Sequence, residues 1–586
     1  MTSNSSAIKR LKAFEADADA AIEALPILQL PARAVLAGLH YLVFTGFHTG
    51  QLTGAEEAGI GETIIQRISN SLPLLRELPA EPYGESAEDA ITAFTEALED
   101  ESTLIELLSY LHFSEFMPEV HRGYYAVESD GVDRFELCHK DLEFADCQAK
   151  DITLSEIALP FPIERTTRIE SDFGRLAEMA PEIDWRFAAK YVTINAYKYR
   201  HGMAEADLIT DVSIQHIFGF DRTRFIFIRS VVLAFAEFCD KLATTMHALV
   251  LAKKLPEDRM AEALEWVSVN LNEDFLVGFF AVGAGAEPAE VARFLEYYSI
   301  DFTQAPASDL GGDGFFPPFA RFENGLLFSP LMVMAFLQVR NAVFGFSKKD
   351  KKTFDNDVSC ELEPVLLDQA CELLRRGGDW IALADIKFPG GQIDLLVTAP
   401  DDDAVLLIQA KGTMPPQGAR LTERLASRVR EGIEQIEKFE ELPEDAQRGV
   451  IEQALKRKVG KVNVSHALMT RSCFGAVEVF AADFPHVRLT APLLSLSLEY
   501  HRDAKLPTTV AALTQAIADT EVRIFERSGY HWEQGEMVLA GAMIKMPLLK
   551  WATGSLETLR QDWWNSTIRP KLDATKQPST PSPSHP

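Results

Sequence analysis

The sequence predicts a multidomain protein of α plus α/β class, with a large, mostly helical N-terminal region followed by an α/β domain built on a central mixed sheet. Three observations predict this class. The chain has 586 residues, more than one hydrophobic core normally organises. Through most of the first 345 residues, apolar side chains recur at the three- and four-residue spacing of amphipathic helices. After residue 358, short apolar runs of strand length alternate with helical patterns.

Composition favours a globular protein that is not a general nucleic-acid binder. Hydrophobic residues make up 47% of the chain and charged residues 25%, which is ordinary for a soluble fold. The net charge is −30, from 87 acidic and 57 basic residues. That charge opposes non-specific attraction to phosphate backbones, so nucleic-acid binding would require a local basic patch.

Cysteine usage and the apolar stretches indicate a cytoplasmic protein with no membrane partner. The six cysteines form no CxxC pair and have no zinc-like spacing with histidine, so we expect reduced thiols. The first 20 residues lack the hydrophobic region of a signal peptide. The longest apolar stretches are shorter than a membrane span and are expected to be buried helices.

The helical region, residues 1–345, is expected to contain two β-hairpins and to divide into two subdomains. Asp130-Gly131 and Asn324-Gly325 each lie between runs with strand character, and such pairs favour tight hairpin turns. The charged stretch 346–357 lacks apolar periodicity and is interpreted as a linker.

Residues 358–505 have the pattern of the α/β domain. A helix is expected from Glu361 to Arg376, because the pair Gly377-Gly378 ends the apolar period there. Strands are expected at 379–388, 391–399, 404–412 and 463–472, with a fifth within 487–500 and a long charged helix over 420–441. The remaining chain is predicted to form C-terminal helices over 506–570 and a disordered, low-complexity tail over 571–586.

Polar residues interrupt two neighbouring strands in a way that predicts a site. Asp394 stands among apolar neighbours, and the next strand ends on Gln409, Ala410 and Lys411. Alternate residues of a strand face the same side, so Gln409 and Lys411 point together and can meet Asp394 if the strands pair. The Asp394 carboxylate, the Gln409 amide oxygen and the Ala410 backbone carbonyl are hard ligands suited to Mg²⁺ or Mn²⁺. Lys411 would orient or help to deprotonate an attacking water.

These pieces resemble the PD-(D/E)xK nuclease superfamily, and within it the Mrr-like restriction endonucleases whose last motif reads QxK. The matching residues are Gly391-Gln392-Ile393-Asp394 and Ile408-Gln409-Ala410-Lys411. The family also places a glutamate in the helix before the strands. Glu363 suits that position best, and Glu361 is the second choice.

The resemblance covers about residues 358–500 and implies a restriction-endonuclease-like fold. It implies a magnesium-dependent hydrolase, an endonuclease that binds DNA and cuts its phosphodiester bonds. Resemblance to restriction enzymes also implies a role in antiviral defence against foreign DNA. Glu363, Asp394, Gln409 and Lys411 are then the expected catalytic residues. Gln409 replaces an acid of the commoner motif, which removes one negative charge and should weaken metal binding.

The three letters of the motif carry little weight by themselves. Gln148-Ala149-Lys150 repeats them, but no apolar strand precedes that copy, and we interpret it as chance. The order of helix glutamate, strand aspartate and strand QxK is the more specific signal.

Basic residues after the motif have two interpretations. They could contact DNA phosphates beside the site, or they could be solvated charges paired with Glu423 and Glu431 at helical spacing. Both interpretations stay open from the sequence. The candidate nucleic-acid contacts are Arg420, Arg424, Arg428, Lys456 and Lys458.

Two other functions remain as alternatives. The domain could be a catalytically inactive nuclease fold that binds DNA or protein, or the chain could be a helical oligomeric scaffold. In each case the N-terminal helical region is expected to bind a partner protein or further copies of the chain.

Overall fold

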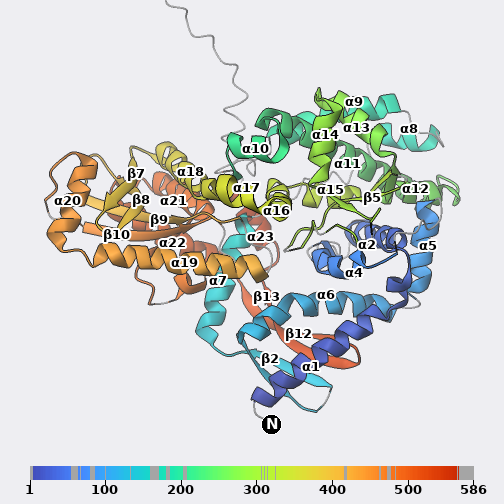
Figure 1. The fold of residues 1–586 in the computed structure, drawn as a ribbon, viewed down its shortest axis with the longest axis horizontal. Helices are drawn as coiled ribbons and strands as arrows, with labels where there is room; N and C mark the ends of the chain where they lie inside the picture. Colours follow the sequence, from blue (N-terminus) through green and yellow to red (C-terminus); the bar gives the residue numbers. More distant parts are fainter. Residues whose placement is uncertain are drawn as a thin grey trace, which may run out of the picture.

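The computed structural model has three lobes, with the α/β lobe at the left of Figure 1, a helical lobe at the upper right and a third lobe below them. The structure describes residues 4–53, 64–65, 67–79, 86–98, 101–131, 133–158, 171–179, 185–201, 208–304, 306–308, 310–312, 314–323, 325–414, 419–460, 463–471, 477–481, 483–563 and 565. The predicted tail, 571–586, lies outside these residues.

The helical lobe is organised around α11 (Arg222–Leu251), a 30-residue helix that is apolar on most of its surface and therefore buried. Its N-terminus is capped by Asp221, whose side chain accepts a hydrogen bond from the Arg224 N–H. Helices α8, α9, α12, α13 and α15 pack against it. The lobe contains α2 (Ala32–Thr53), α4 (Leu72–Arg76), α5 (Ala87–Ala97), α8 (Ser171–Met179), α9 (Trp185–His201), α10 (Asp211–Phe218), α12 (Arg259–Val267), α13 (Glu273–Ala284), α14 (Pro288–Glu296), α15 (Pro330–Phe336) and α16 (Val339–Lys349).

Both predicted hairpins are confirmed. The first consists of β1 (Tyr125–Ser129) and β2 (Arg134–His139), which pair antiparallel. The second consists of β5 (Phe319–Phe322) and β6 (Gly325–Phe328), which belong to a sheet of order β3-β6-β5-β4 with β3 (Val269–Leu271) and β4 (Ser299–Asp301). Asn324, in the second predicted turn, lies outside the described residues.

The predicted linker over 346–357 is wrong. Helix α16 is followed directly by α17 (Lys351–Thr353) and by a π-helical turn, Phe354–Val358. Phe354 and Val358 are buried in the core of the helical lobe. The burial of these two apolar residues explains why the segment is ordered, although charged residues surround them in the sequence.

The prediction that 506–570 holds only helices is also wrong. Between α22 (Val510–Ser528) and α23 (Ser555–Trp563) lie β12 (His531–Leu539) and β13 (Ala542–Lys550). Their turn is Ala540-Gly541, with positive φ at both residues (46° and 76°), as a tight hairpin requires.

This C-terminal hairpin joins the N-terminal one. Strand β13 pairs parallel with β2, which gives a sheet of order β1-β2-β13-β12. Helices α1 (Asn4–Glu23) and α6 (Glu101–Arg122) share a core with this sheet. The third lobe is therefore built from both ends of the chain, as Figure 1 shows in blue and red.

The α/β lobe holds a mixed sheet, as predicted. The sheet has five strands in the order β11-β10-β9-β8-β7. Strands β7, β8 and β9 pair antiparallel, and β9, β10 and β11 pair parallel. The elements are α18 (Leu362–Gly377), β7 (Ile381–Phe388), β8 (Gly391–Thr398), β9 (Ala404–Lys411), α19 (Ala419–Glu440), α20 (Glu444–Leu455), β10 (Asn463–Thr470), β11 (Val487–Thr490) and α21 (Ala491–Asp503).

Helices cover both faces of this sheet. Leu406, Ile408 and Ala410 of β9 belong to one core, with α18, α21, α22 and most of α19. Val405 and Leu407 alternate with them and belong to a second core, with α20 and the end of α19. Helix α7 (Leu142–Ala158) also packs on the first core. Because Gln148-Ala149-Lys150 lies within this helix, the second copy of the QxK letters is not at the end of a strand.

Within the described parts of the chain, no single helix has the length and apolar character needed to cross a membrane. Two sharply bent pairs meet those criteria only when their members are combined: α13 with α14, bent by 113°, and α15 with α16, bent by 79°.

Candidate functional site

The sheet brings Asp394, Gln409 and Lys411 together, as the sequence predicts. Strands β8 and β9 pair with Leu395 opposite Ile408, so the next position places Asp394 opposite Gln409. Lys411 lies two residues further along the same face of β9. All three side chains are buried, with exposed fractions of 4% for Asp394, 4% for Gln409 and 6% for Lys411.

Gln409 holds Asp394 in place. The Gln409 Nε2 group donates a hydrogen bond to Asp394 Oδ2, and the Ala410 backbone N–H donates to the same oxygen at 2.9 Å. In this arrangement Gln409 turns its amide nitrogen toward the carboxylate, which differs from the role predicted for it as an oxygen ligand. The second carboxylate oxygen, Oδ1, is not used by these two donors.

Glu363 reaches the site from the first turn of α18. Its Oε2 lies 3.8 Å from Lys411 Nζ, an ion-pair distance that is too long for a hydrogen bond. The Gly412 backbone N–H donates a hydrogen bond to the Glu363 carboxylate. Glu361, the alternative choice, instead accepts hydrogen bonds from Thr210 and Ser213 of the helical lobe, so Glu363 is the glutamate that faces Lys411.

Two glycines allow these close approaches. A Cβ on Gly412 would lie 2.4 Å from Glu363 Cα, so only glycine lets the end of β9 approach the start of α18 this closely. A Cβ on Gly432, in the middle of α19, would lie 3.2 Å from Lys411 Cε and 2.6 Å from Leu468 Cδ1. Glycine is unfavourable inside a helix, and here its absence of a side chain leaves room for the stem of Lys411.

The two carboxylates share a confined and electrostatically strained environment. Burial raises the pKa of Asp394, against the opposing effects of the Ala410 N–H and Lys411. Burial also raises the pKa of Glu363, Lys411 opposes that rise, and the charge on Asp394 adds to it. A cation placed between the carboxylates would relieve both effects.

The carboxylate oxygens of Glu363 and Asp394 fit a hard divalent cation such as Mg²⁺ or Mn²⁺. Gln409 does not fit as it lies, because its amide donates to Asp394, and it would have to turn its oxygen toward the ion. Among the residues that the structure describes, no group of three or more His, Cys, Asp or Glu side chains is placed to hold a metal ion. A cation would therefore need Gln409, the Ala410 carbonyl or water as further ligands.

Among the predicted nucleic-acid contacts whose side chains the structure describes, Arg428 has a charge that lowers the pKa of Glu363. Its guanidinium also donates to Glu431 at 2.7 Å. Arg424 is exposed on the same helix, α19, and the side chain of Arg420 lies outside the described residues.

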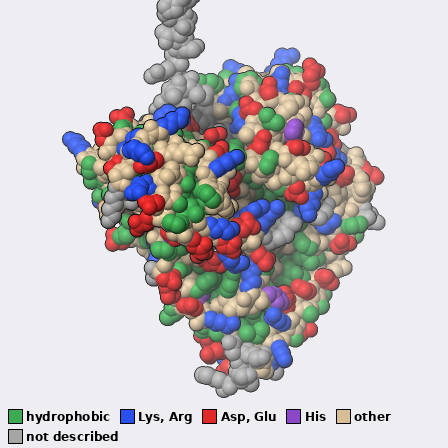
Figure 2. All heavy atoms as spheres, turned by 60° about the vertical axis from the view of Figure 1, so that its left-hand side comes forward, with side chains coloured by type: hydrophobic (Ala, Val, Ile, Leu, Met, Phe, Trp, Pro, Cys, Tyr) green, Lys and Arg blue, Asp and Glu red, His purple; other side chains and the backbone are tan. Residues whose placement is uncertain are grey.

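Lys456 and Lys458 lie at the opposite end of the sheet from Lys411. Between them, Arg457 pairs with Asp403, which immediately precedes β9, whereas Lys411 ends that strand. A strand of this length separates the two places by roughly 25 Å. Lys458 also pairs with Glu452 at 2.8 Å. Figure 2 shows acidic and basic side chains interspersed over the visible face.

The structure adds residues that the sequence analysis did not identify. Asp385 of β7 contributes to the rise in the pKa of Asp394 and accepts a hydrogen bond from Gln392 Nε2 at 3.0 Å. Arg471, just after β10, donates to Gln369 at 3.1 Å and to the Leu362 carbonyl at 3.2 Å, beside the start of α18. In the sequence, Asp385 and Arg471 are isolated polar residues without a motif. The strand register brings Asp385 to the site, and the packing of α18 brings Arg471 there.

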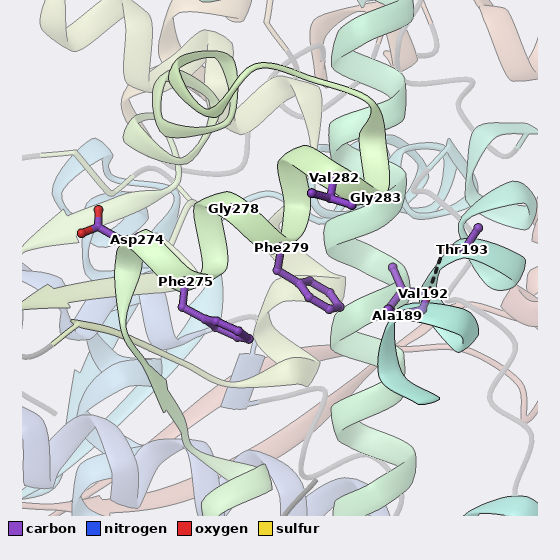
Figure 3. Close-up of a pocket in the computed structure, with 9 residues that line it drawn as sticks. All are labelled: Ala189, Val192, Thr193, Asp274, Phe275, Gly278, Phe279, Val282 and Gly283. Atoms are coloured by element: carbon purple, nitrogen blue, oxygen red, sulfur yellow. Dashed lines mark hydrogen bonds between the residues drawn. The ribbon is translucent and has the colours of Figure 1, made fainter. Parts of the chain in front are cut away.

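A hollow of about 410 Å³ lies in the helical lobe between α9 and α13. Phe275, Phe279 and Val282 of α13 line it, opposite Ala189 and Thr193 of α9 (Figure 3). Asp274 is the one titratable side chain among the lining residues that the structure describes. The hollow therefore offers apolar contact and no set of groups for acid–base chemistry.

Comparison of the chain with protein-family models, with curated proteins and with solved structures gave no match.

Proposed function

We propose that residues 358–505 form a metal-dependent endonuclease domain of the PD-(D/E)xK type, which hydrolyses phosphodiester bonds of DNA. One observation carries the proposal. Three charged groups from three separate elements, Glu363 of α18, Asp394 of β8 and Lys411 of β9, lie together near the end of β9, and two of the three are buried. Buried charges are costly, and such clusters are concentrated at functional sites.

The order of the elements supports the proposal. Helix α18 precedes β7, β8 and β9, which are followed by α19 and β10. The core of the PD-(D/E)xK superfamily has this helix–strand–strand–strand–helix–strand order, and here α20 is inserted before β10. Strands β9 and β10 pair parallel, and Thr470 lies opposite Lys411.

Each residue of the site has a distinct proposed role. Glu363 and Asp394 would hold Mg²⁺ or Mn²⁺, and the bound ion would lower the pKa of a water molecule and offset charge on the leaving oxygen. Gln409 and the Ala410 N–H fix the Asp394 carboxylate through their hydrogen bonds. Lys411 carries a positive charge at the site, where it can orient the attacking water and stabilise negative charge on the phosphate.

Arg428 is the proposed phosphate contact on α19, because it is near enough to Glu363 to lower the pKa of that residue. A DNA strand bound there would lie along the exposed face of α19. The proposed part in defence against foreign DNA rests on the resemblance to restriction endonucleases alone.

The helical lobe is proposed to bind a partner or a second copy and to influence the nuclease site. Support comes from one contact: Thr210 and Ser213 of the helical lobe both donate to Glu361, two residues before Glu363. A movement of α10 would therefore displace Glu361 and the start of α18.

Cleavage of supercoiled plasmid DNA in Mg²⁺ or Mn²⁺ tests the proposal. We expect the wild-type chain to nick or linearise the plasmid, and Lys411→Ala and Asp394→Ala to lose that activity while they remain folded. Lys458→Ala is the matched control, because it removes an exposed lysine at the far end of the sheet and should cut normally. Equal cutting by all variants would show that the activity does not come from this site.

One observation favours a second candidate, a nuclease fold that binds without cutting. Asp394 Oδ2 already receives two hydrogen bonds from within the domain, so the carboxylate is partly satisfied without a cation. Under this alternative, DNA or a protein partner would bind to the wild type and to the Lys411→Ala variant alike, and no variant would cut.

A further inference from the structure

Asp385 lies directly across from Asp394 on the neighbouring strand. Strands β7 and β8 pair with Ala384 opposite Leu395 and Ile386 opposite Ile393, which places the two aspartates at the position between. Opposite residues of an antiparallel pair project from the same face, and like charges in that arrangement repel. The raised pKa of Asp394 includes this repulsion.

The backbone at Asp385 is also unusual. Its φ is +59°, in the left-handed region that few residues other than glycine adopt, although aspartate and asparagine tolerate it. One position of an otherwise regular strand thus combines a strained backbone with an opposed charge. Departures of this kind persist where the surrounding structure holds them for a functional reason.

Gln392 links the two aspartates. Its Nε2 donates to Asp385 Oδ1 at 3.0 Å, and its side chain also hydrogen-bonds the Asp394 carboxylate. The two carboxylates are therefore held by one amide on the same face as the buried Lys411. The ammonium of Lys411 makes no hydrogen bond to Glu363 at 3.8 Å, and remains able to bind a further group.

We infer that Asp385 is a positioning residue of the proposed nuclease site: it supplies the negative charge that Gln409 lacks and, through Gln392, fixes Asp394 for a divalent cation. The inference rests on the proposed function. With Asp385 included, three carboxylates and one lysine leave a net charge of about −2, which matches a divalent ion. Without it, the neutral Gln409 would leave the site one charge short.

Titration of the full chain with Mn²⁺ in the absence of DNA, followed by calorimetry, tests the inference. Asp385→Asn keeps the shape and tolerates the positive φ, and should bind Mn²⁺ roughly tenfold more weakly than the wild type because one nearby charge is gone. Asp385→Gly accommodates the same backbone and should weaken binding similarly. Asp401→Asn removes an exposed acid from the β8–β9 turn and should bind as the wild type does.

A matched pair of variants separates the effect of charge from a general effect on structure. Asp385→Glu and Asp385→Gln have side chains of the same length and differ in charge, and both leave the Gln409 donor to Asp394 in place, so we expect Asp385→Glu to bind Mn²⁺ more tightly than Asp385→Gln. Equal binding by the two would overturn the inference, because a purely structural defect does not depend on charge.

The inference and the proposed function can fail separately. If Asp385→Asn and Asp385→Gly bind Mn²⁺ as tightly as the wild type, while Asp394→Asn does not, the inference is overturned and the metal site stands. If the wild type itself binds no Mn²⁺, the proposed metal site is overturned and the inference falls with it.

Discussion

Gly412→Ala should move Glu363 of α18 away from Lys411 of β9, because Gly412 is the point where β9 and α18 approach each other closely. The added Cβ would lie 2.4 Å from Glu363 Cα, 2.5 Å from Glu363 N and 2.5 Å from the Leu362 carbonyl carbon. All three are backbone atoms, which cannot turn aside as a side chain can. The start of α18 must therefore move away from the end of β9.

The size of that movement follows from ordinary contact distances. Carbon atoms in contact lie about 3.5 Å apart, so the gap must open by about 1 Å. Overpacking of this kind destabilises a fold by typically 1–3 kcal/mol. The movement would also lengthen the distance from Glu363 to Lys411, now 3.8 Å, and misplacement by about 1 Å costs roughly 100-fold in rate.

Two measurements check this prediction, thermal unfolding and the initial rate of plasmid cleavage in Mn²⁺. We expect a lower Tm and a strongly reduced rate for Gly412→Ala. Gly449→Ala is the matched control, because a Cβ at that position of α20 meets nothing within 4 Å, and alanine should stabilise the helix by up to about 1 kcal/mol. A Gly412→Ala variant with wild-type stability and rate would refute the close packing of β9 against α18.

Four further predictions follow from the same contacts. Asp394→Asn should raise the metal-free protein's stability at pH 7, because a buried carboxylate whose pKa is raised costs energy when ionised; urea unfolding of the two proteins measures this. The pKa values of Asp394 and Glu363 both rise on folding, so the folded state binds more protons than the unfolded state between the unfolded and the folded pKa values. These two groups should therefore make the metal-free chain more stable as the pH falls from 7 through the folded pKa values. Asp394→Asn should flatten that part of the stability–pH curve. Phe354→Ala should lower stability by about 3–5 kcal/mol, as loss of a buried core side chain does, whereas a linker residue would cost almost nothing. Gly541→Val should destabilise the chain by about 1–3 kcal/mol, since valine is strained at φ 76°, and a smaller loss would contradict the tight turn between β12 and β13.

The sequence predicted the α/β lobe well because its signals are local. The strands around Asp394 and Lys411 have apolar runs of strand length with acidic turn residues between them, and β8 and β9 lie close to the predicted ranges. The pairing of these strands follows from the short connection, so the convergence of Asp394, Gln409 and Lys411 was also predictable.

What the sequence did not predict depends on contacts between distant segments. The β12–β13 hairpin pairs with β2, some 400 residues earlier, and its Ala540-Gly541 turn lacks the usual asparagine or aspartate. The segment 346–357 was misassigned because charged neighbours mask the burial of Phe354 and Val358.

The missed residues of the site have the same explanation. In the sequence, Asp385 is a polar residue in a partly exposed strand and has no sign of a role at the site. Only the register of β7 and β8 shows that it lies opposite Asp394. The donor role of Gln409 depends on the orientation of its amide, which the motif alone does not specify.

The central claim is that Glu363, Asp394 and Lys411 form one cation-dependent site. The most direct test is anomalous diffraction from crystals of the full chain soaked in Mn²⁺. We expect a manganese peak within coordination distance of the Glu363 and Asp394 carboxylates. Manganese bound elsewhere, with no peak beside these two residues, would contradict it.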